Sequence, residues 1–309
     1  MRYVIGIDSG GTKYLVKAAN LKGQVLGKFE GLPAGFRFDS LQCAVKKVSQ
    51  NIDSCLSQFG GNRADCVYMV CGSTGIDSKE DYFRIKEVYE NLPGFSCPLR
   101  CVNDAEVAQY AATGGIGVLV ISGTGSIAFG RNAQGETARS GGWWLSMAAD
   151  EGSGTYITVR ALQHLALWFD HRIDESKLAL RLKNTLYINK RKDLITLGRS
   201  SASKWGPLNI PQIVDQAAEQ GDAAALRIIQ DAAGHTYDLA NSVVKKLNFD
   251  KDLAFKVGVW GSAITKSRLH FHFFKEKFEN EYHHVQVILP EKDAADGALQ
   301  MALDLLKKR

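Results

Sequence analysis

Apolar runs of strand length alternate with amphipathic stretches along the first hundred residues of the chain. Five runs have the length and composition of strands and are separated by turn residues, at 3–8, 15–20, 24–30, 67–71 and 99–102. Apolar residues recur at helical spacing over 41–56, and a more polar helix is expected over 79–91. This order predicts an open α/β sheet that starts with three consecutive strands.

The same pattern begins again near residue 118. Strands are expected at 118–122 and 127–131, followed by a weaker third strand. The two hairpins turn on similar sequences, Asn20-Leu21-Lys22-Gly23-Gln24 and Asn132-Ala133-Gln134-Gly135-Glu136. We interpret this as an internal duplication at an offset of about 113 residues, with two unrelated glycine turns as the alternative.

The second half differs from the first by a long helical stretch. Amphipathic helices are expected over most of 151–250. The chain then continues as strand, helix, strand and helix, at 255–260, 263–279, 285–288 and 294–307. We therefore expect two domains, 1–113 and 114–309, of which the second carries the helical insertion. The last helix is a candidate to pack back on the first domain.

Composition narrows the class of protein. The chain has 309 residues, of which 45% are hydrophobic, and this excludes a disordered tail, a collagen-like fibre and a small disulfide scaffold. Single cores stop growing at about 250–300 residues, so two domains with a functional cleft between them are expected. The net charge of +5 is too small to indicate a nucleic-acid partner. The most basic stretch, Lys183–Lys192, has almost no aromatic residues and is typical of a solvated face.

Cysteine usage and the lack of a long apolar segment bear on location. The six cysteines are scattered without a CxxC pair, at Cys43, Cys55, Cys66, Cys71, Cys97 and Cys101. Such a pattern favours free thiols in a reducing compartment. Nowhere do 18 consecutive apolar residues occur. We expect a cytoplasmic protein with no membrane partner.

Two glycine-rich turns join strands at matching points of the two repeats. The first, Asp8-Ser9-Gly10-Gly11-Thr12-Lys13, can present backbone N–H groups to an anion, although a plain hairpin turn is the alternative. Asp8, at the end of a strand, could hold Mg²⁺ through water. The second turn is Ser122-Gly123-Thr124-Gly125-Ser126. Two such turns facing each other would grip a polyphosphate from both sides.

Two further segments carry groups suited to a sugar. Asn103-Asp104-Ala105 follows a strand and opens a helix, so Asp104 is either an N-cap or a general base toward a hydroxyl group, and both roles are compatible. Gly141-Gly142-Trp143-Trp144 and Asp150-Glu151-Gly152-Ser153 combine glycine, tryptophan and acids, as carbohydrate sites do. The alternative is a loop with a buried tryptophan ahead of an acidic helix start.

Together, these five motifs resemble the N-acetylglucosamine kinases in order and spacing over nearly the whole chain. Those kinases belong to the sugar kinase, heat-shock ATPase and actin superfamily, as do the activator ATPases of benzoyl-CoA reductase and 2-hydroxyglutaryl-CoA dehydratase. The resemblance implies an α/β protein with two ribonuclease-H-like (actin-like ATPase) domains that close on ATP, Mg²⁺ and an amino sugar. It also implies a homodimer.

The resemblance assigns roles to individual positions. Asp104 resembles the catalytic base, which would accept the proton of a sugar hydroxyl as that hydroxyl attacks the γ-phosphate in line. The implied cofactor-binding residues are Asp8, Gly10, Gly11, Thr12, Lys13, Ser122, Gly123, Thr124, Gly125, Ser126, Gly261 and Ser262, with Asp8 also the water-mediated metal ligand. The implied substrate-binding residues are Ser73, Thr74, Gly75, Asn103, Asp104, Gly142, Trp143 and Asp150.

Two positions depart from the family pattern, and two interpretations stay open. Gly35 stands where these kinases usually present a sugar-contacting Asn, and Trp144 stands where Gly is common. The preferred sugar therefore stays open among N-acetylglucosamine, N-acetylmuramic acid and glucosamine, as does the hydroxyl that is phosphorylated. An activator ATPase is the alternative function, for which Cys97 and Cys101 are the close cysteine pair that could ligate an iron–sulfur cluster.

Overall fold

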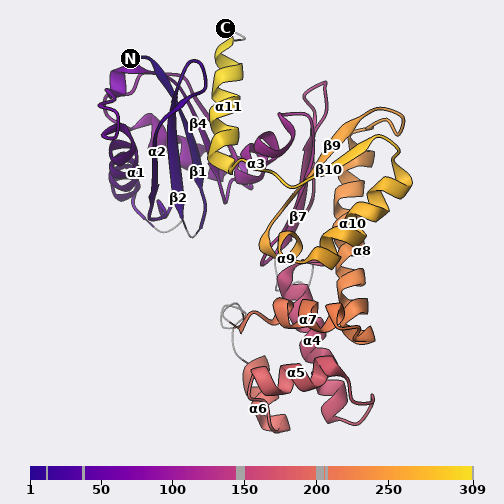
Figure 1. Ribbon diagram of the computed structural model, residues 1–309. Coiled ribbons are helices and arrows are strands. Elements are labelled where there is room, and N and C mark those ends of the chain that lie inside the picture. The colour runs from indigo at the N-terminus through magenta and orange to yellow at the C-terminus, as the bar shows by residue number, and fades with distance from the viewer. Residues whose placement is uncertain (12, 37–38, 144–149, 200–204, 206–207, 308–309) are drawn as a thin grey trace. The chain divides into compact units, whose positions relative to one another are not determined.

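The computed structural model describes residues 1–309 except 12, 37–38, 144–149, 200–204, 206–207 and 308–309. The chain forms two compact units, which are labelled by their elements in Figure 1. The first unit comprises residues 1–117 together with 290–309, and the second comprises residues 118–289. Each unit is built on one five-stranded sheet.

The sheet of the first unit has the order β3-β2-β1-β4-β5. Its strands are β1 (Tyr3–Ser9), β2 (Tyr14–Asn20), β3 (Val25–Gly31), β4 (Cys66–Ser73) and β5 (Leu99–Asn103). Strands β1 to β3 form an antiparallel meander, whereas β4 and β5 run parallel to β1. The helical elements are α1 (Leu41–Leu56), η1 (Arg63–Asp65), α2 (Lys79–Glu90), α3 (Asp104–Thr113) and α11 (Ala294–Lys307). Helices α1 and α2 cover one face of the sheet, and α3 and α11 cover the other (Figure 1).

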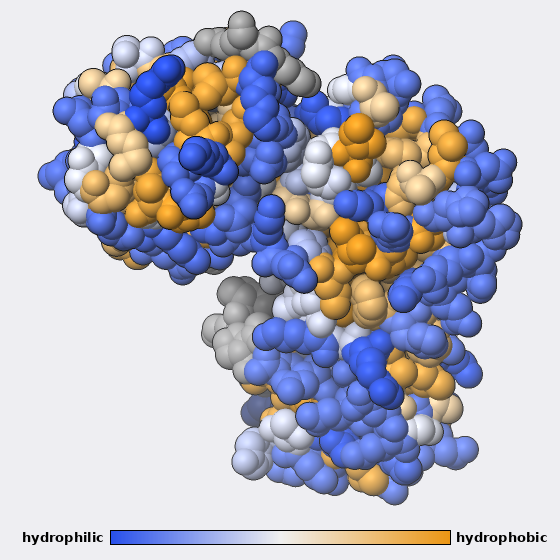
Figure 2. All heavy atoms as spheres, turned by 45° about the horizontal axis from the view of Figure 1, so that its top comes forward, coloured by the Kyte–Doolittle hydropathy of each residue, from blue (hydrophilic) through white to orange (hydrophobic). Residues whose placement is uncertain are grey.

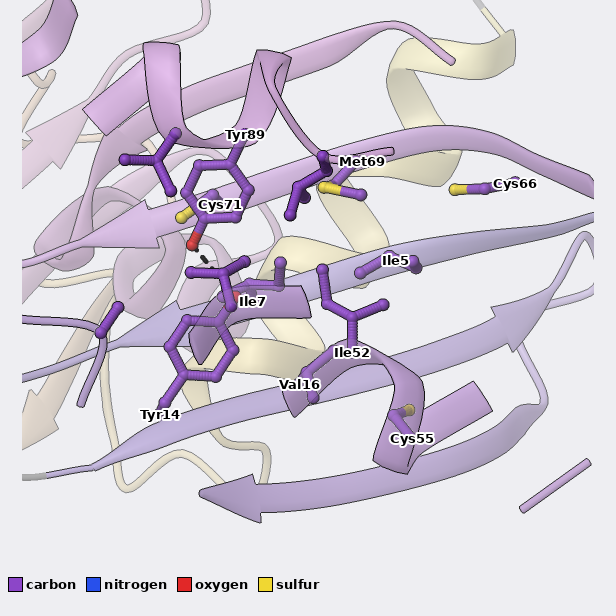
Figure 3. Close-up of a cluster of buried hydrophobic side chains, with 14 of the residues drawn as sticks. Ile5, Ile7, Tyr14, Val16, Ile52, Cys55, Cys66, Met69, Cys71 and Tyr89 are labelled. Atoms are coloured by element: carbon purple, nitrogen blue, oxygen red, sulfur yellow. Dashed lines mark hydrogen bonds between the residues drawn. The ribbon is translucent and has the colours of Figure 1, made fainter. Parts of the chain in front are cut away.

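The core under α1 and α2 consists of fully buried aliphatic, aromatic and cysteine side chains (Figure 3). Ile5 and Ile7 of β1 alternate with residues that face the other side of the sheet, and Ile52 of α1 packs against them. Two buried tyrosines, Tyr14 and Tyr89, share a hydrogen bond of 3.1 Å between their hydroxyl groups. Burying both hydroxyls without this bond would be costly, so the pair specifies how α2 docks on the sheet.

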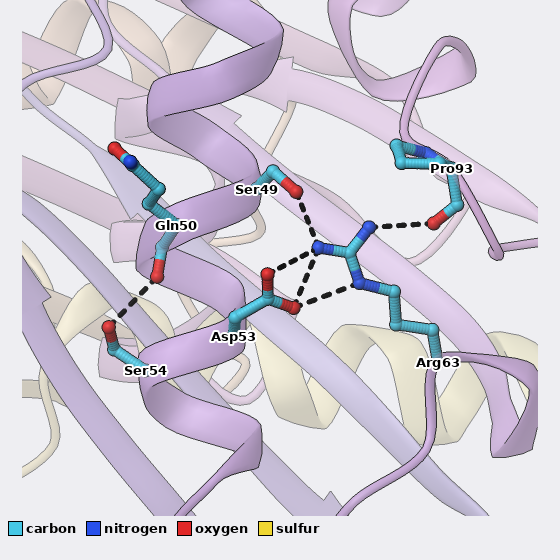
Figure 4. Close-up of polar contacts among 6 residues, drawn as sticks. All are labelled: Ser49, Gln50, Asp53, Ser54, Arg63 and Pro93. Carbon is cyan, nitrogen blue, oxygen red and sulfur yellow. Dashed lines mark hydrogen bonds and ion pairs between the residues drawn. The ribbon is translucent and has the colours of Figure 1, made fainter.

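Arg63 fixes the periphery of the same layer (Figure 4). Its guanidinium donates to the Asp53 carboxylate of α1 at 2.6 and 2.9 Å and to the Pro93 carbonyl at 2.7 Å. It also donates to the Ser49 hydroxyl. The planar, five-donor guanidinium can satisfy these acceptors together, and it thereby ties α1 to the loop after α2.

Helix α11 packs closely against both the sheet and α3. A Cβ on Gly6 of β1 would come within 2.6 Å of a carbonyl oxygen of α11, and one on Gly297 within 2.7 Å of a backbone nitrogen of α3. The ammonium group of Lys17, whose side chain is 8% exposed, pairs with Asp293 at 2.7 Å and with Asp296 at 2.6 Å. Glycine at both contact points thus allows the approach, and the buried ion pairs fix the helix in register.

The sheet of the second unit has the order β10-β9-β6-β7-β8. Its strands are β6 (Gly117–Ser122), β7 (Ser126–Arg131), β8 (Thr137–Gly141), β9 (Phe255–Trp260) and β10 (Val285–Ile288). Its helices are α4 (Gly154–Phe169), α5 (Lys177–Thr185), α6 (Arg191–Gly198), α7 (Ile210–Glu219), α8 (Ala223–Lys246), α9 (Ser262–Thr265) and α10 (Arg268–Glu281). Helices α8 and α10 pack over the sheet, and α4, α5, α7 and part of α8 share a separate apolar cluster.

When the strands of each sheet are numbered 1 to 5 along the chain, both sheets have the order 3-2-1-4-5. This confirms the predicted duplication and the two-domain α/β fold. The hairpin turns match in atomic detail as well. The side-chain oxygen of Asn20 accepts a hydrogen bond from the Gln24 N–H at 3.1 Å, and that of Asn132 accepts from the Glu136 N–H at 3.0 Å. In both turns the asparagine amide also reaches the side chain of the residue four positions on.

One predicted helix is interrupted in the structure. The helix expected over 263–279 is two helices, α9 and α10, because Ser267 between them caps α10 by accepting the His270 N–H at 3.1 Å. Lys190, Arg191 and Lys192 are exposed, as expected for a solvated basic stretch, and Asp193 accepts from the backbone of Lys190 at the start of α6.

Hydrophilic residues cover most of the face shown in Figure 2, with smaller hydrophobic patches on each unit. Within the described residues, no helix is long and apolar enough to cross a membrane.

Candidate functional site

Three parallel strands of the first unit end side by side. Ser9 pairs in register with Ser73, and Ser73 pairs with Asn103. Asp8 and Asp104 therefore lie at the carboxyl ends of β1 and β5, on either side of β4. Ligands of open α/β sheets bind at this edge.

The segment after β4 stays at the same edge. The backbone N–H of Thr74 donates to the Ser9 carbonyl at 2.9 Å, and Gly75 has a left-handed φ of 82°. The Ser73 hydroxyl, which is buried, donates to the Thr74 carbonyl at 3.1 Å. The first-unit residues predicted to bind sugar are thus gathered around one point of the sheet.

Asp8 carries the strongest electrostatic perturbation at this edge. Burial, as the largest cause, and the nearby Asp104 carboxylate together raise the pKa of its carboxyl group to about 6, against the opposing positive charge of Lys13. Asp293, from the segment before α11, adds to the rise. Several acids that share one desolvated region create a demand for a cation.

Asp104 lies in the first turn of α3, and the residue before it, Asn103, caps the helix. The side-chain oxygen of Asn103 accepts from the Ala105 N–H at 3.0 Å, so Asn103 and not Asp104 is the N-cap residue. Asp104 also accepts from that N–H through Oδ1, at 2.9 Å. The Asn103 amide donates to the Ile76 carbonyl at 3.2 Å, which joins the loops after β4 and β5. The Asp104 carboxylate is therefore held in the first turn of α3, at the positive end of the helix dipole.

The first glycine-rich turn is tight. The Gly10 N–H donates to the Lys13 carbonyl at 2.9 Å, while Gly11 and Lys13 are exposed. Thr12 lies outside the described residues. A phosphate-binding turn at this place would act through the exposed part of the loop.

The departure at Gly35 has a structural counterpart. Gly35 has a φ of 70°, and a Cβ there would overlap the carboxylate of Asp39. Asp39 in turn accepts from the Lys47 ammonium at 2.7 Å, and this bond raises the pKa of Lys47. Because Gly31 at the end of β3 pairs with Tyr14, the segment leaves the sheet at the same edge as Asp8. The Asp39–Lys47 ion pair thus stands beside Gly35.

The second glycine-rich turn, Ser122–Ser126, is held by the segment that precedes α4. The Ser122 hydroxyl donates to the Gly152 carbonyl at 2.8 Å, and the Ser126 hydroxyl donates to the Glu151 carbonyl at 2.7 Å. The Thr155 hydroxyl donates to the Thr124 carbonyl at 2.7 Å. Both predicted serines therefore shape the turn with their side chains.

Asp150 lies against the same turn. Its carboxylate accepts from the Ser126 N–H at 3.5 Å, and a Cβ on Gly125 would come within 3.0 Å of it. Burial raises the pKa of the Asp150 carboxyl group, and the Ser126 N–H lowers it. The Gly142 N–H donates to the Ser126 carbonyl at 2.9 Å, whereas Trp143 is 65% exposed. Trp144, the other departure, lies outside the described residues.

Gly261 closes the turn from the side of β9. It has a φ of 92°, and a Cβ there would lie 2.7 Å from the Gly123 nitrogen. Ser262, the next residue, begins α9. The structure thus brings Gly261 into direct contact with the Ser122–Ser126 turn, although the two segments are far apart in the sequence.

A pocket of about 560 Å³ opens beside this turn within the second unit. Its wall combines Gly123 and Thr124 with the first turns of α4, one face of α7, and the Ser262–Ser267 segment. The sequence analysis missed the wall from α7, which presents Gln212, Asp215, Gln216 and Glu219 to the pocket. Their spacing of three and four residues was the available signal for a shared face. The arrangement offers an anion-binding turn at one side and hydrogen-bonding side chains at the other.

Comparisons with known proteins agree with this architecture. Over 308 residues, the chain is 32% identical to an N-acetylmuramic acid/N-acetylglucosamine kinase of Clostridium acetobutylicum, with 98% of each chain covered. It is 30% identical over 319 residues to an N-acetyl-D-glucosamine kinase of Dictyostelium discoideum, again with 98% of each chain covered. Among solved structures, a candidate N-acetylglucosamine kinase from Chromobacterium violaceum matches with a TM-score of 0.74 and 23% identity, over 98% of this chain and 99% of that one.

The solved structure establishes the fold, which is that of the actin-like ATPases and sugar kinases. Residues 5–302 match a single protein family over almost the full length of the chain. The chain belongs to the BadF/BadG/BcrA/BcrD ATPase family.

Proposed function

We propose that this protein transfers the γ-phosphate of ATP to a hydroxyl group of an amino sugar, with N-acetylglucosamine as the first candidate. The observation that carries the proposal is the placement of Asp104 at the carboxyl edge of the first sheet, next to Asp8 and Ser73. The names of the two relatives, both amino-sugar kinases, support the same acceptor class.

Asp104 acts as the general base in this proposal. Phosphoryl transfer needs positioning and charge neutralisation more than covalent catalysis. One carboxylate near the acceptor hydroxyl is therefore enough to serve as the catalytic base. The first turn of α3 holds Asp104 in place, where it would accept the hydroxyl proton. Asn103, Ser73, Thr74 and Gly75 would orient the sugar around it.

ATP would bind in the second unit. The Ser122–Ser126 turn is preformed by hydrogen bonds from its own serines and Thr155, so it needs little rearrangement to receive phosphate. The adjacent pocket has the volume of typical cofactor sites. The first glycine-rich turn would also bind phosphate, through Gly10, Gly11, Thr12 and Lys13.

The acid pair of the first unit fits a magnesium ion. Asp8 and Asp104 are close enough to raise the pKa of Asp8, and a hard divalent cation relieves such repulsion. Asp8 would hold Mg²⁺ through water, and Mg²⁺, when bound, neutralises charge on the phosphates. Within the described residues, no group of three or more His, Cys, Asp or Glu side chains is arranged as a metal cage. Mg²⁺ commonly binds through one or two carboxylates, with substrate phosphates and water as its other ligands.

N-acetylmuramic acid is the second candidate acceptor, and glucosamine the third. The relative from Clostridium acetobutylicum is named for N-acetylmuramic acid as well as N-acetylglucosamine. The Asp39–Lys47 pair places a cation and an anion near the sugar-binding edge, and the cation could accommodate an acidic substituent. A panel of sugars with and without a carboxylate distinguishes these acceptors.

The activator-ATPase alternative is disfavoured by the state of its cysteines. Cluster ligation needs thiolates. Cys101 is buried in β5, and burial raises the pKa of its thiol to about 12. Cys97 lies near Cys66, with 3.5 Å between the two sulfur atoms. All six cysteines are free.

We further propose that the protein is a cytoplasmic homodimer.

The test is sugar-dependent ADP formation in a coupled assay, with NMR of the product to locate the phosphate. Asp104→Asn should abolish sugar-dependent turnover and leave ADP binding intact. Glu80→Gln is the matched control, because Glu80 is an exposed acid in the first turn of α2. Unchanged turnover in Asp104→Asn, or iron and brown colour in the purified protein, would overturn the proposal.

A further inference from the structure

Helix α7 has a polar face that lines the pocket of the second unit. Asp215 lies on this face together with Gln212 and Glu219, while the opposite face is buried in the apolar cluster through Ile213, Val214 and Ala217. A polar face on an amphipathic helix ordinarily meets bulk water. Here it meets a pocket whose other wall is the Ser122–Ser126 turn, so its side chains are available to a ligand that extends from that turn.

Successive residues of α7 lie progressively farther from the Ser122–Ser126 turn. A Cβ on Gly154, whose N–H donates to the Gly123 carbonyl at 2.7 Å, would lie 3.6 Å from the Pro211 ring. Pro211 therefore marks the end of α7 nearest the turn. At a rise of about 1.5 Å per residue, Asp215 is about 6 Å farther along the helix and Glu219 about 12 Å. One helical turn is close to the span from a nucleotide's diphosphate to its ribose hydroxyl groups.

Asp215 is fixed in place by Ser267. The Ser267 hydroxyl donates to the Asp215 carboxylate while it accepts from the His270 N–H at 3.1 Å. Ser267 is itself buried, and burial raises the pKa of the Asp215 carboxyl group. A carboxylate offers about four acceptor positions, so one hydrogen bond from Ser267 leaves capacity for a pair of neighbouring hydroxyl donors.

We propose that Asp215 recognises the ribose of the bound nucleotide by accepting hydrogen bonds from its vicinal hydroxyl groups. The inference rests on the proposed function only in that the nucleotide is the ligand of this pocket. Asp215 would make the protein selective for ribonucleotides over deoxyribonucleotides. It is a binding residue and takes no part in the transfer step.

The test measures binding of ADP, 2′-deoxy-ADP and 3′-deoxy-ADP by calorimetry, without sugar or turnover. A hydrogen bond to a charged group contributes enough that the wild-type protein should bind ADP about 10- to 100-fold more tightly than at least one deoxy analogue. In Asp215→Ala this preference should fall to less than about threefold, mainly because ADP binds more weakly. Asp215→Asn, which keeps an acceptor for Ser267, should lose the preference in part and serves as the variant least prone to unfold.

Glu219→Gln is the matched control, since it removes a carboxylate from the same face one turn beyond Asp215. It should keep the preference for ADP over both deoxy analogues. The proposal is overturned if folded Asp215→Ala retains the wild-type preference. It is also overturned if this variant alters discrimination between ADP and GDP while leaving the ribose preference unchanged, because Asp215 would then contact the base.

Combined with the assay of sugar-dependent ADP formation, this binding measurement separates the inference from the proposed function. If ADP binds with Asp215-dependent ribose selectivity but no amino sugar is phosphorylated, the inference holds and the kinase proposal fails. If an amino sugar is phosphorylated but the ribose preference is absent or independent of Asp215, the inference fails alone. A wild-type protein that does not bind ADP would overturn both.

Discussion

The carboxylate of Asp39 fills the space that a side chain at position 35 would need. Gly35 is held at a left-handed φ of 70°, its carbonyl accepts the Asp39 N–H at 2.9 Å, and Lys47 pairs with the carboxylate. A side chain at position 35 would have to displace Asp39 and disturb its ion pair with Lys47. The glycine and the ion pair are therefore one structural feature.

The substitution Gly35→Asn tests this coupling. Overlap with Asp39 should lower the free energy of unfolding by about 1–3 kcal/mol, measured by urea denaturation. Gly60→Asn is the control, because Gly60 has a similar φ of 66° with no atom near its Cβ position, and it should cost less than about 1 kcal/mol. Adding Asp39→Ala to Gly35→Asn should restore stability; a cost that persists in the double variant would contradict the overlap.

Gly261→Ala should damage the phosphate turn of the second unit. Its φ of 92° and its contact with Ser122 and Gly123 leave no space for a Cβ, so we expect a loss of about 3 kcal/mol and weaker ADP binding. Gly135→Ala introduces a similar φ strain in open space and should cost about 1–2 kcal/mol without affecting ADP binding. Equal effects of the two variants on ADP affinity would refute the role assigned to Gly261.

Removal of the metal should stop turnover, and Asp8 should set the metal requirement. With a chelator in excess, we expect no sugar-dependent ADP formation. Asp8→Asn should raise the Mg²⁺ concentration for half-maximal activity about 10- to 100-fold, as loss of a water-mediated ligand does. Titration of Mg²⁺ at fixed ATP measures this shift, with Asp65→Asn, a substitution on the periphery of the first unit, as the control. An unchanged requirement in Asp8→Asn would remove Asp8 from the metal site.

The buried His270 predicts a pH dependence of stability. Burial lowers the pKa of His270 to about 4, while the unfolded chain has an ordinary pKa near 6.5. Below pH 6.5 the unfolded state binds the proton and the folded state does not, so stability falls as the pH drops from about 6.5 to about 4. This difference corresponds to about 3 kcal/mol.

Thermal or urea unfolding between pH 4 and 7 measures the effect. His270→Gln should lose this part of the pH dependence, although it is less stable at pH 7 because Thr236 shares a hydrogen bond with the His270 ring. His272 lies on the same helix, so His272→Gln is the control. It should keep the wild-type slope of stability against pH. If His270→Gln kept the wild-type slope, another group would have to account for it.

The sequence pattern was sufficient for the sheets and for their duplication. Strand positions followed from short apolar runs, and the repeated Asn-to-Gly turns gave the matching hairpins, because an asparagine side chain can close such a turn by itself. The break between α9 and α10 was not predicted, since neither proline nor glycine marks it. It depends on the Ser267 cap and on Asp215, 52 residues away in the chain.

The place of a candidate site residue in the fold was predictable only where glycine or a strand end marks it. Asp104 and both glycine-rich turns follow strands directly. The sequence could not show that Ser122 and Ser126 use their hydroxyl groups to hold the turn, because their acceptors lie in a separate segment. The polar face of α7 resembled a solvated surface, and its role in the pocket depends on where α4 and α9 bring the second turn.

The two units differ in the point of translation at which all of their residues have been synthesised. The second unit is continuous, so every residue of its sheet and helices has been synthesised by residue 289. The first unit lacks one of its face-covering helices until 294–307 emerge, and until then Lys17 has neither Asp293 nor Asp296 beside it. The unit that is translated first is therefore completed last, because the helix that covers one face of its sheet is made after the whole of the second unit.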